Sequence, residues 1–257
     1  MKRLCLTMLI GVVLFAGYAV AQDKVVLSNG EWKPYLSKEL KHFGVASHIV
    51  TEAYKREGVI TEYKWYGESW KRAYKDTKDG KVDGSLIWSK KPERLIEMYY
   101  SEPVIKGKKD VFYHLKSNKF SWNTIEDLKG KRVGGTAGYA YGPLIEEAVK
   151  KGYITMDLVS KESLNLQKLL KGRIDLFLSG VVVGSDMIKE KLTPEQAALI
   201  TFHEKPYREA TYHLILTKAK PANKAFLDKF NAGLKKLQGE GLYDQYLKES
   251  EAGKYEK

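Results

Sequence analysis

The sequence predicts an α/β protein of two lobes, each a mostly parallel sheet flanked by helices. Strand-like and helix-like stretches alternate from residue 24 to residue 88, and the alternation restarts near residue 124. This alternation is typical of parallel sheets, in which helices connect successive strands. About 235 residues would follow a cleaved leader, which is enough for two lobes of ordinary size.

An export signal is expected at the N-terminus. Lys2 and Arg3 precede an apolar run over residues 4–16, and Ala19-Val-Ala21 has the spacing that a signal peptidase recognises. The run is short for a bilayer-spanning helix, which is the alternative. We therefore expect cleavage near Ala21-Gln22 and a periplasmic mature protein.

Charge and cysteine content exclude several classes of function. The only cysteine, Cys5, lies in the expected signal, so the mature chain has no disulfide and no thiol nucleophile. The net charge of +12 comes from lysines spread among acidic residues along the whole chain. This distribution favours a solvated surface, and no basic block interleaved with aromatics indicates nucleic-acid binding.

The first five elements follow from hydrophobic periodicity. Ile49, Val50, Ala53 and Tyr54 recur at helical spacing before Gly58 ends the helix. The expected order is a strand at 24–29, a helix at 46–57, a strand at 60–65, a helix at 70–78 and a strand at 82–88.

The second series begins at Thr124, which precedes Ile-Glu-Asp-Leu in the pattern of a capped helical turn. The expected elements are a strand at 131–134, helices at 143–151 and 164–171, and a strand at 174–178. This series predicts a second lobe over residues 111–206. A strand at 212–216, an amphipathic helix at 223–238 and a short helix from Leu242 complete the chain.

Five short strings carry a family resemblance by their order and spacing: Val82-Asp-Gly-Ser-Leu-Ile-Trp88, Glu93-Arg-Leu-Ile-Glu-Met-Tyr-Tyr-Ser-Glu-Pro-Val104, Asp127-Leu-Lys-Gly-Lys-Arg-Val133, Gly172-Arg-Ile-Asp-Leu-Phe177 and Gly239-Glu-Gly-Leu-Tyr-Asp-Gln-Tyr-Leu247. The chain resembles the type II periplasmic solute-binding proteins, in particular family 3, the polar amino-acid binders that serve ABC importers. The resemblance covers essentially the whole mature chain.

The resemblance implies the architecture and the partners. Lobe 1 would comprise residues 22–110 and 207–257, lobe 2 residues 111–206, and two crossing segments would act as a hinge. A small polar or carboxylate-bearing solute would bind in the cleft for delivery to the permease of an ABC importer. No cofactor or metal is expected, and the protein is expected to be monomeric.

In lobe 1, the resemblance makes Arg94 the clamp for a ligand carboxylate, and a planar, permanently charged guanidinium suits a bidentate contact. A surface arginine on a helix is the alternative. Ser89, after Trp88 at the end of a strand, would offer a hydroxyl and backbone N–H groups, or would cap the helix that follows. Trp88 is included among the expected ligand contacts.

Aromatic residues of lobe 1 are expected to cover the ligand. Trp32 matches the family aromatic in the first loop, with Tyr35 beside it, and core packing is the alternative. Trp70 and Arg72 open a helix where the family usually has small or apolar residues. They would line the cleft rim, or form an ordinary amphipathic face.

In lobe 2, Gly138-Tyr139 stands where the family usually has a Gly-Thr pair that binds the carboxylate, so the pocket shape must differ. A connecting turn is the alternative. Ser179-Gly180 follows the strand at 174–178, where the family places an aspartate for the α-amino group of the ligand. Either Glu31, Asp186 or another carboxylate replaces it, or the ligand is not a standard α-amino acid.

The sequence supports other functions less well. A soluble sensor that presents its ligand to a membrane receptor would use the same cleft. A dehydratase-like enzyme on this scaffold would need an acid in lobe 2, and Ser179 and Gly180 provide none. The histidines have no metal-ligand spacing, and a serine nucleophile lacks a Gly-x-Ser-x-Gly turn.

Overall fold

The structure is a computed structural model that describes residues 22–257. The predicted signal peptide, residues 1–21, lies outside this part of the chain. Among the described helices, none has both the length and the apolar character needed to cross a membrane.

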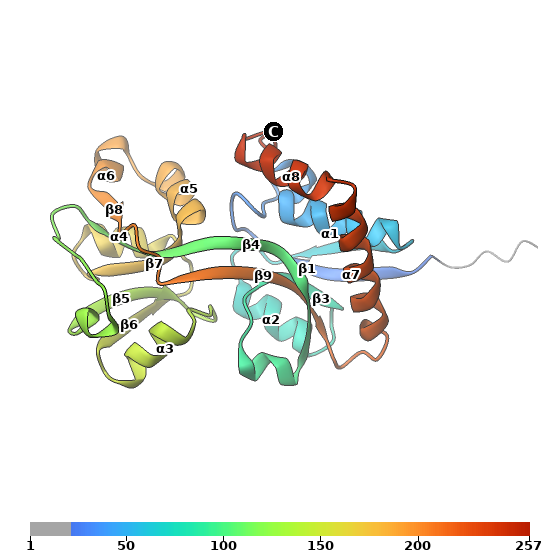
Figure 1. Cartoon of the computed structure of the whole chain (residues 1–257), viewed down its shortest axis with the longest axis horizontal. Coiled ribbons are helices and arrows are strands. Elements are labelled where there is room, and N and C mark those ends of the chain that lie inside the picture. Colours follow the sequence, from blue (N-terminus) through green and yellow to red (C-terminus); the bar gives the residue numbers. More distant parts are fainter. Residues whose placement is uncertain (1–21) are drawn as a thin grey trace, which may run out of the picture.

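The first lobe is built on three strands that pair in parallel, in the order β2, β1, β3. Helices pack on both sides of this sheet (Figure 1). The elements are β1 (Lys24–Asn29), α1 (Val45–Arg56), β2 (Ile60–Trp65), α2 (Trp70–Lys78), β3 (Gly84–Trp88), the 3-10 helices η1 (Lys41–Phe43) and η2 (Pro92–Ile96), α7 (Asn223–Gly239) and α8 (Leu242–Glu251).

The second lobe repeats this plan with strands in the order β7, β5, β6, again paired in parallel. Its elements are η3 (Ile125–Leu128), β5 (Lys131–Thr136), α3 (Pro143–Lys150), β6 (Ile154–Val159), α4 (Leu164–Leu170), β7 (Leu176–Gly180), α5 (Val181–Lys191), α6 (Pro194–Ala198) and β8 (Ile200–Phe202). Thr124 and Asp127 form the predicted capping box.

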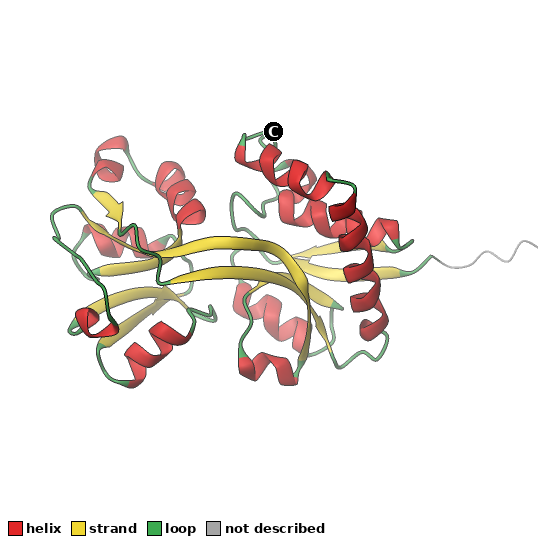
Figure 2. Cartoon of the chain, in the orientation of Figure 1, coloured by secondary structure: helices red, strands yellow, loops and turns green. Residues whose placement is uncertain are grey.

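Two antiparallel strands, β4 (Met98–Leu115) and β9 (Arg208–Thr217), run side by side from one lobe to the other (Figures 1 and 2). They join the two parallel units into one continuous sheet, because β9 also pairs with β3 and β4 also pairs with β7. The predicted two-lobed α/β fold is confirmed. The predicted lobe boundaries fall inside β4 and just before β9, and the division at those residues stays a prediction.

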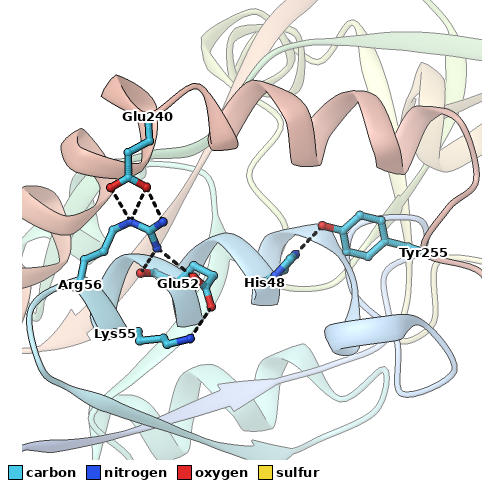
Figure 3. Close-up of polar contacts among 6 residues, drawn as sticks. All are labelled: His48, Glu52, Lys55, Arg56, Glu240 and Tyr255. Atoms are coloured by element: carbon cyan, nitrogen blue, oxygen red, sulfur yellow. Dashed lines mark hydrogen bonds and ion pairs between the residues drawn. The ribbon is translucent and has the colours of Figure 1, made fainter.

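The last helices close the first lobe over α1. Gly233 of α7 lies directly on α1, where a Cβ at this position would be 1.9 Å from the carbonyl oxygen of Ala53. Figure 3 shows the polar contacts beside it. Nε of Arg56 donates to both carboxylate oxygens of Glu240, and Nδ1 of His48 lies 2.6 Å from the hydroxyl of Tyr255. Chain segments nearly two hundred residues apart therefore form one core.

The predicted elements match the structure with three kinds of difference. Most boundaries shift by one or two residues. No strand was predicted where β4, β6 and β8 lie, and no helix where α5 follows β7 without a break. Ser89 is not a helix cap, because the 3-10 helix begins at Pro92 and its N-cap residue is Lys91.

Candidate functional site

A cavity that is partly open to solvent lies between the lobes. Its walls come from loops at the carboxyl ends of the parallel strands of both lobes, where open α/β sheets usually bind ligands. Nine of the predicted site residues line it: Trp32, Trp70, Trp88, Ser89, Arg94, Gly138, Tyr139, Ser179 and Gly180.

Two predicted residues lie outside the lining. Tyr35 is buried behind Trp32, with the two ring centroids 5.4 Å apart, so it supports the wall from the core side. Arg72 is exposed on α2, where its guanidinium lies 5.9 Å from the ring of Tyr66. The helix therefore turns Trp70 toward the cavity and Arg72 away from it.

Arg94 is buried at the first-lobe end of the cavity, with 7% of its surface exposed. Its guanidinium lies over the rings of Trp88 and Tyr74, at 4.8 and 5.1 Å from their centroids. It donates to two carbonyl oxygens, those of Ser89 (3.4 Å) and of Gly138 in the second lobe. Within residues 22–257, no carboxylate lies within ion-pair distance of Arg94, so a buried cation is left without a counter-ion.

Glu162, in the loop between β6 and α4, places a carboxylate in the same cavity. Its Oε1 accepts a hydrogen bond from Ser179 (2.8 Å), and its Oε2 accepts from the indole of Trp32 (3.1 Å) and the hydroxyl of Tyr139 (3.2 Å). Burial raises the pKa of Glu162 to about 7 although these three donors favour the ionised form. None of the donors is charged, so this carboxylate also lacks a counter-ion among the described residues.

Asp110 and Arg208 form the floor of the cavity as directly opposed residues of β4 and β9. Nε of Arg208 donates to Oδ2 of Asp110 (2.6 Å), and the hydroxyl of Tyr212 donates to Oδ1 (3.4 Å). Burial raises the pKa of Asp110, against the opposing effect of Arg208. This pair therefore sits on the two strands that connect the lobes.

The floor also explains the unusual residue at position 180. Asp110 pairs with Gly180 across β4 and β7, and a Cβ on Gly180 would lie 3.3 Å from Oδ1 of Asp110. The space that an aspartate would fill here is already occupied by a carboxylate from the neighbouring strand. Two other segments bring carboxylates to the cavity, those of Asp110 and Glu162.

Glu31 and Asp186, the two replacements named from the sequence, lie instead in a neighbouring hollow. Trp32, Tyr139 and Glu162 contribute to both spaces and separate them. The third option named from the sequence, another carboxylate, therefore fits the structure. The sequence argument that the second lobe lacks an acid at the cavity was wrong, because Glu162 lies beside Ser179.

No metal centre is indicated within the part of the chain that the structure describes, because no group of three or more His, Cys, Asp or Glu side chains is arranged around a common point.

Comparisons with known proteins agree on the type of protein. Residues 25–250 match the family described as bacterial extracellular solute-binding proteins, family 3. A protein of Campylobacter jejuni described as a probable histidine-binding protein is 25% identical over 224 residues, covering 86% of this chain and 81% of its own length.

Two solved structures show the same fold. An ancestral arginine-binding protein bound to arginine superposes with a TM-score of 0.73 at 20% identity, covering 89% of this chain and 98% of its own. A histidine kinase sensor domain with similarity to periplasmic binding proteins also gives 0.73, at 16% identity, with 89% and 96% covered.

Proposed function

Because the chain belongs to family 3 of the bacterial extracellular solute-binding proteins, we propose that it binds an α-amino acid zwitterion between its lobes and delivers it to the permease of an ABC importer. The observation that carries this proposal is the pair of uncompensated charges in one cavity. Arg94 has no carboxylate partner and Glu162 has no cationic partner among the described residues.

The opposite charges of Arg94 and Glu162 favour a zwitterion as the ligand of the cavity. A buried charge without a counter-ion costs several kcal/mol, so each of these two side chains is stabilised by an opposite charge from the ligand. A carboxylate on Arg94 and an ammonium on Glu162 satisfy both at once. A ligand with only one of these groups leaves one buried charge uncompensated.

The walls support binding of a compact organic molecule. Trp32, Trp70, Trp88 and Tyr139 supply flat apolar faces around the two charged groups, and such faces cover a carbon skeleton well. The names of the relatives point to the same class of ligand, since one is described as histidine-binding and another was solved with arginine.

Binding is proposed to act by closing the cleft. Trp32 and Arg94 of the first lobe already contact Glu162 and Gly138 of the second. A zwitterion held by Arg94 of the first lobe and Glu162 of the second would bridge the lobes, so the ligand would favour the closed state. The hinge would lie where β4 and β9 cross, near the predicted boundaries at 110/111 and 206/207.

The cellular setting belongs to the same proposal. Family 3 proteins are extracellular solute-binding proteins, and the expected cleavage near Ala21-Gln22 would release this chain into the periplasm as a monomer. A sensor that presents the same ligand to a membrane receptor is distinguished by its partner.

The test is a thermal-shift screen of residues 22–257 against the twenty L-amino acids, followed by calorimetry on each hit. Arg94→Ala is expected to weaken binding by a hundredfold or more, because a ligand carboxylate would lose its buried partner. Arg173→Ala, an exposed arginine of the second lobe, is the control and should bind normally.

The outcomes separate the alternatives. If no amino acid stabilises the protein, or if Arg94→Ala binds as tightly as wild type, the proposed site is wrong. Consumption of a hit over time would indicate an enzyme, and copurification with a receptor ectodomain would indicate a sensor.

A further inference from the structure

The floor of the cavity carries more hydrogen-bond donors than the protein uses. Each carboxylate oxygen of Asp110 already accepts one hydrogen bond, from Arg208 at Oδ2 and from Tyr212 at Oδ1. Arg208 uses only its Nε in the contact with Asp110. Its two terminal nitrogens have no hydrogen-bond partner within residues 22–257.

Tyr207 adds a second unused donor beside the first. It lines the cavity with 6% of its surface exposed, and its hydroxyl has no hydrogen-bond partner in the described structure. Burying a hydroxyl without a hydrogen-bond partner is unfavourable, so few buried hydroxyls in folded proteins are left unpaired. The neighbouring hydroxyl of Tyr141 is already engaged by the backbone N–H of Thr136.

The position of these donors matches what a bound amino acid would leave unfilled. Arg94 and Glu162 would hold the carboxylate and the ammonium, and Asp110 and Arg208 lie on the crossing strands at the bottom of the same cavity. The side chain of the ligand is the part that can reach them. An apolar side chain would leave the buried hydroxyl of Tyr207 and the terminal nitrogens of Arg208 without an acceptor.

We infer that the floor formed by Tyr207 and Arg208 is a specificity subsite that binds an oxygen acceptor, a carboxamide or carboxylate, at the end of the ligand side chain. The inference rests on the proposed function and narrows it to amino acids with acidic or amide side chains. Asp110 acts as a positioning residue: it holds Arg208 by Nε, which leaves the terminal nitrogens for the ligand.

A charge count agrees with this class of ligand. The charged side chains that line the cavity are Arg94, Asp110, Glu162 and Arg208, two positive and two negative. Both negative side chains are engaged, Asp110 by Arg208 and Glu162 by three neutral donors. A cationic side chain would thus lie beside the guanidinium of Arg208 and leave its terminal nitrogens and the hydroxyl of Tyr207 without an acceptor, which is unfavourable.

The experiment is calorimetry of residues 22–257 with L-glutamine, L-glutamate, L-alanine, L-arginine and L-histidine. Glutamine or glutamate is expected to bind at least tenfold more tightly than the other three. Tyr207→Phe removes only the unpaired hydroxyl and should reduce this affinity about tenfold without changing alanine binding, because alanine does not reach the floor.

Tyr54→Phe is the matched control. Its hydroxyl is also buried and unpaired, but it lies in the core of the first lobe away from the cavity. It should leave every affinity unchanged. Arg208→Lys, which keeps a positive charge near Asp110 but loses the fork, should reduce glutamine and glutamate binding more than Tyr207→Phe does.

Two results would overturn the inference while leaving the proposed function intact. One is tighter binding of arginine or histidine than of the oxygen-bearing ligands. The other is equal affinity of wild type and Tyr207→Phe for every ligand. Failure of all amino acids to bind would instead overturn the proposed function.

Discussion

The indole N–H of Trp32 in the first lobe donates to Oε2 of Glu162 in the second lobe, 3.1 Å away. The same carboxylate also accepts from Tyr139 and Ser179. Glu162 is therefore both a wall of the cavity and a contact between the lobes, so its ionisation affects stability, closure and binding together.

Glu162 should make stability depend on pH. Its pKa is about 7 in the folded protein and near its ordinary value of 4.5 when unfolded. Below pH 4.5 it is protonated in both states. From pH 4.5 to 7 the unfolded state loses its proton first, so the free energy of unfolding falls by about 3 kcal/mol across this window, at about 1.4 kcal/mol per pKa unit.

This prediction is checked by urea unfolding of wild type and Glu162→Gln at pH 5 and pH 8 without ligand. The variant cannot ionise, so wild type should lose more stability than the variant over this interval. If the free energy of unfolding changes equally with pH in the two proteins, the pKa of Glu162 is not raised in the folded state.

Ligand binding should release a proton from Glu162. An ammonium group favours the ionised carboxylate, whereas at pH 6 most of the unliganded protein has Glu162 protonated. The affinity should therefore be about tenfold lower at pH 6 than at pH 8. Calorimetry in two buffers of different ionisation enthalpy measures the proton directly, and an identical heat in both at pH 6 would contradict this.

Trp32→Phe should weaken ligand binding about tenfold with little loss of fold. It keeps an aromatic face but removes the donor to Glu162, so the closed form loses one contact between the lobes. Trp122→Phe is the control, because Trp122 is buried in the core of the second lobe and its indole N–H has no hydrogen-bond partner in the part of the chain that the structure describes. Equal affinities for the two variants would remove the Trp32–Glu162 contact from the closing mechanism.

Gly180→Asp should impair the protein even though the family resemblance places an aspartate here. The new carboxylate would press against Asp110, whose Oδ1 lies 3.3 Å from the position of the added Cβ, and two buried carboxylates at this distance cannot both ionise. We expect a lower melting temperature at pH 8 than at pH 5, relative to wild type. Gly180→Ala tests the steric part alone and should be far milder.

The framework of the fold could be predicted because it depends on local signals. Periodicity and glycine stops extend over about a dozen residues, and they located β1, β2, β3, β5 and β7 and most of the helices of both lobes. They missed the parallel strand β6 and helix α5. The crossing strand β4 could not be located in this way. Lysines at residues 106, 108 and 109 break its apolar pattern where it crosses between the lobes.

The site was predicted where a motif marked it and missed where only the tertiary structure creates it. Arg94 lies in a recognisable string. Glu162 has no local signal, because its burial comes from Trp32, Tyr139 and Ser179, which lie on three other segments. Asp110 and Arg208 become a pair only when two strands about a hundred residues apart align.

The contact between Gly233 and Ala53 has a consequence for how the chain acquires its structure. Helix α7, which seals the first lobe, and β9, which pairs with β3, are both synthesised after the whole of the second lobe. The second lobe draws its parallel strands and helices from one uninterrupted stretch of chain. The contacts of the second lobe are closer in sequence, so it can fold first during synthesis. The first lobe is completed only after β9 and α7 have been made.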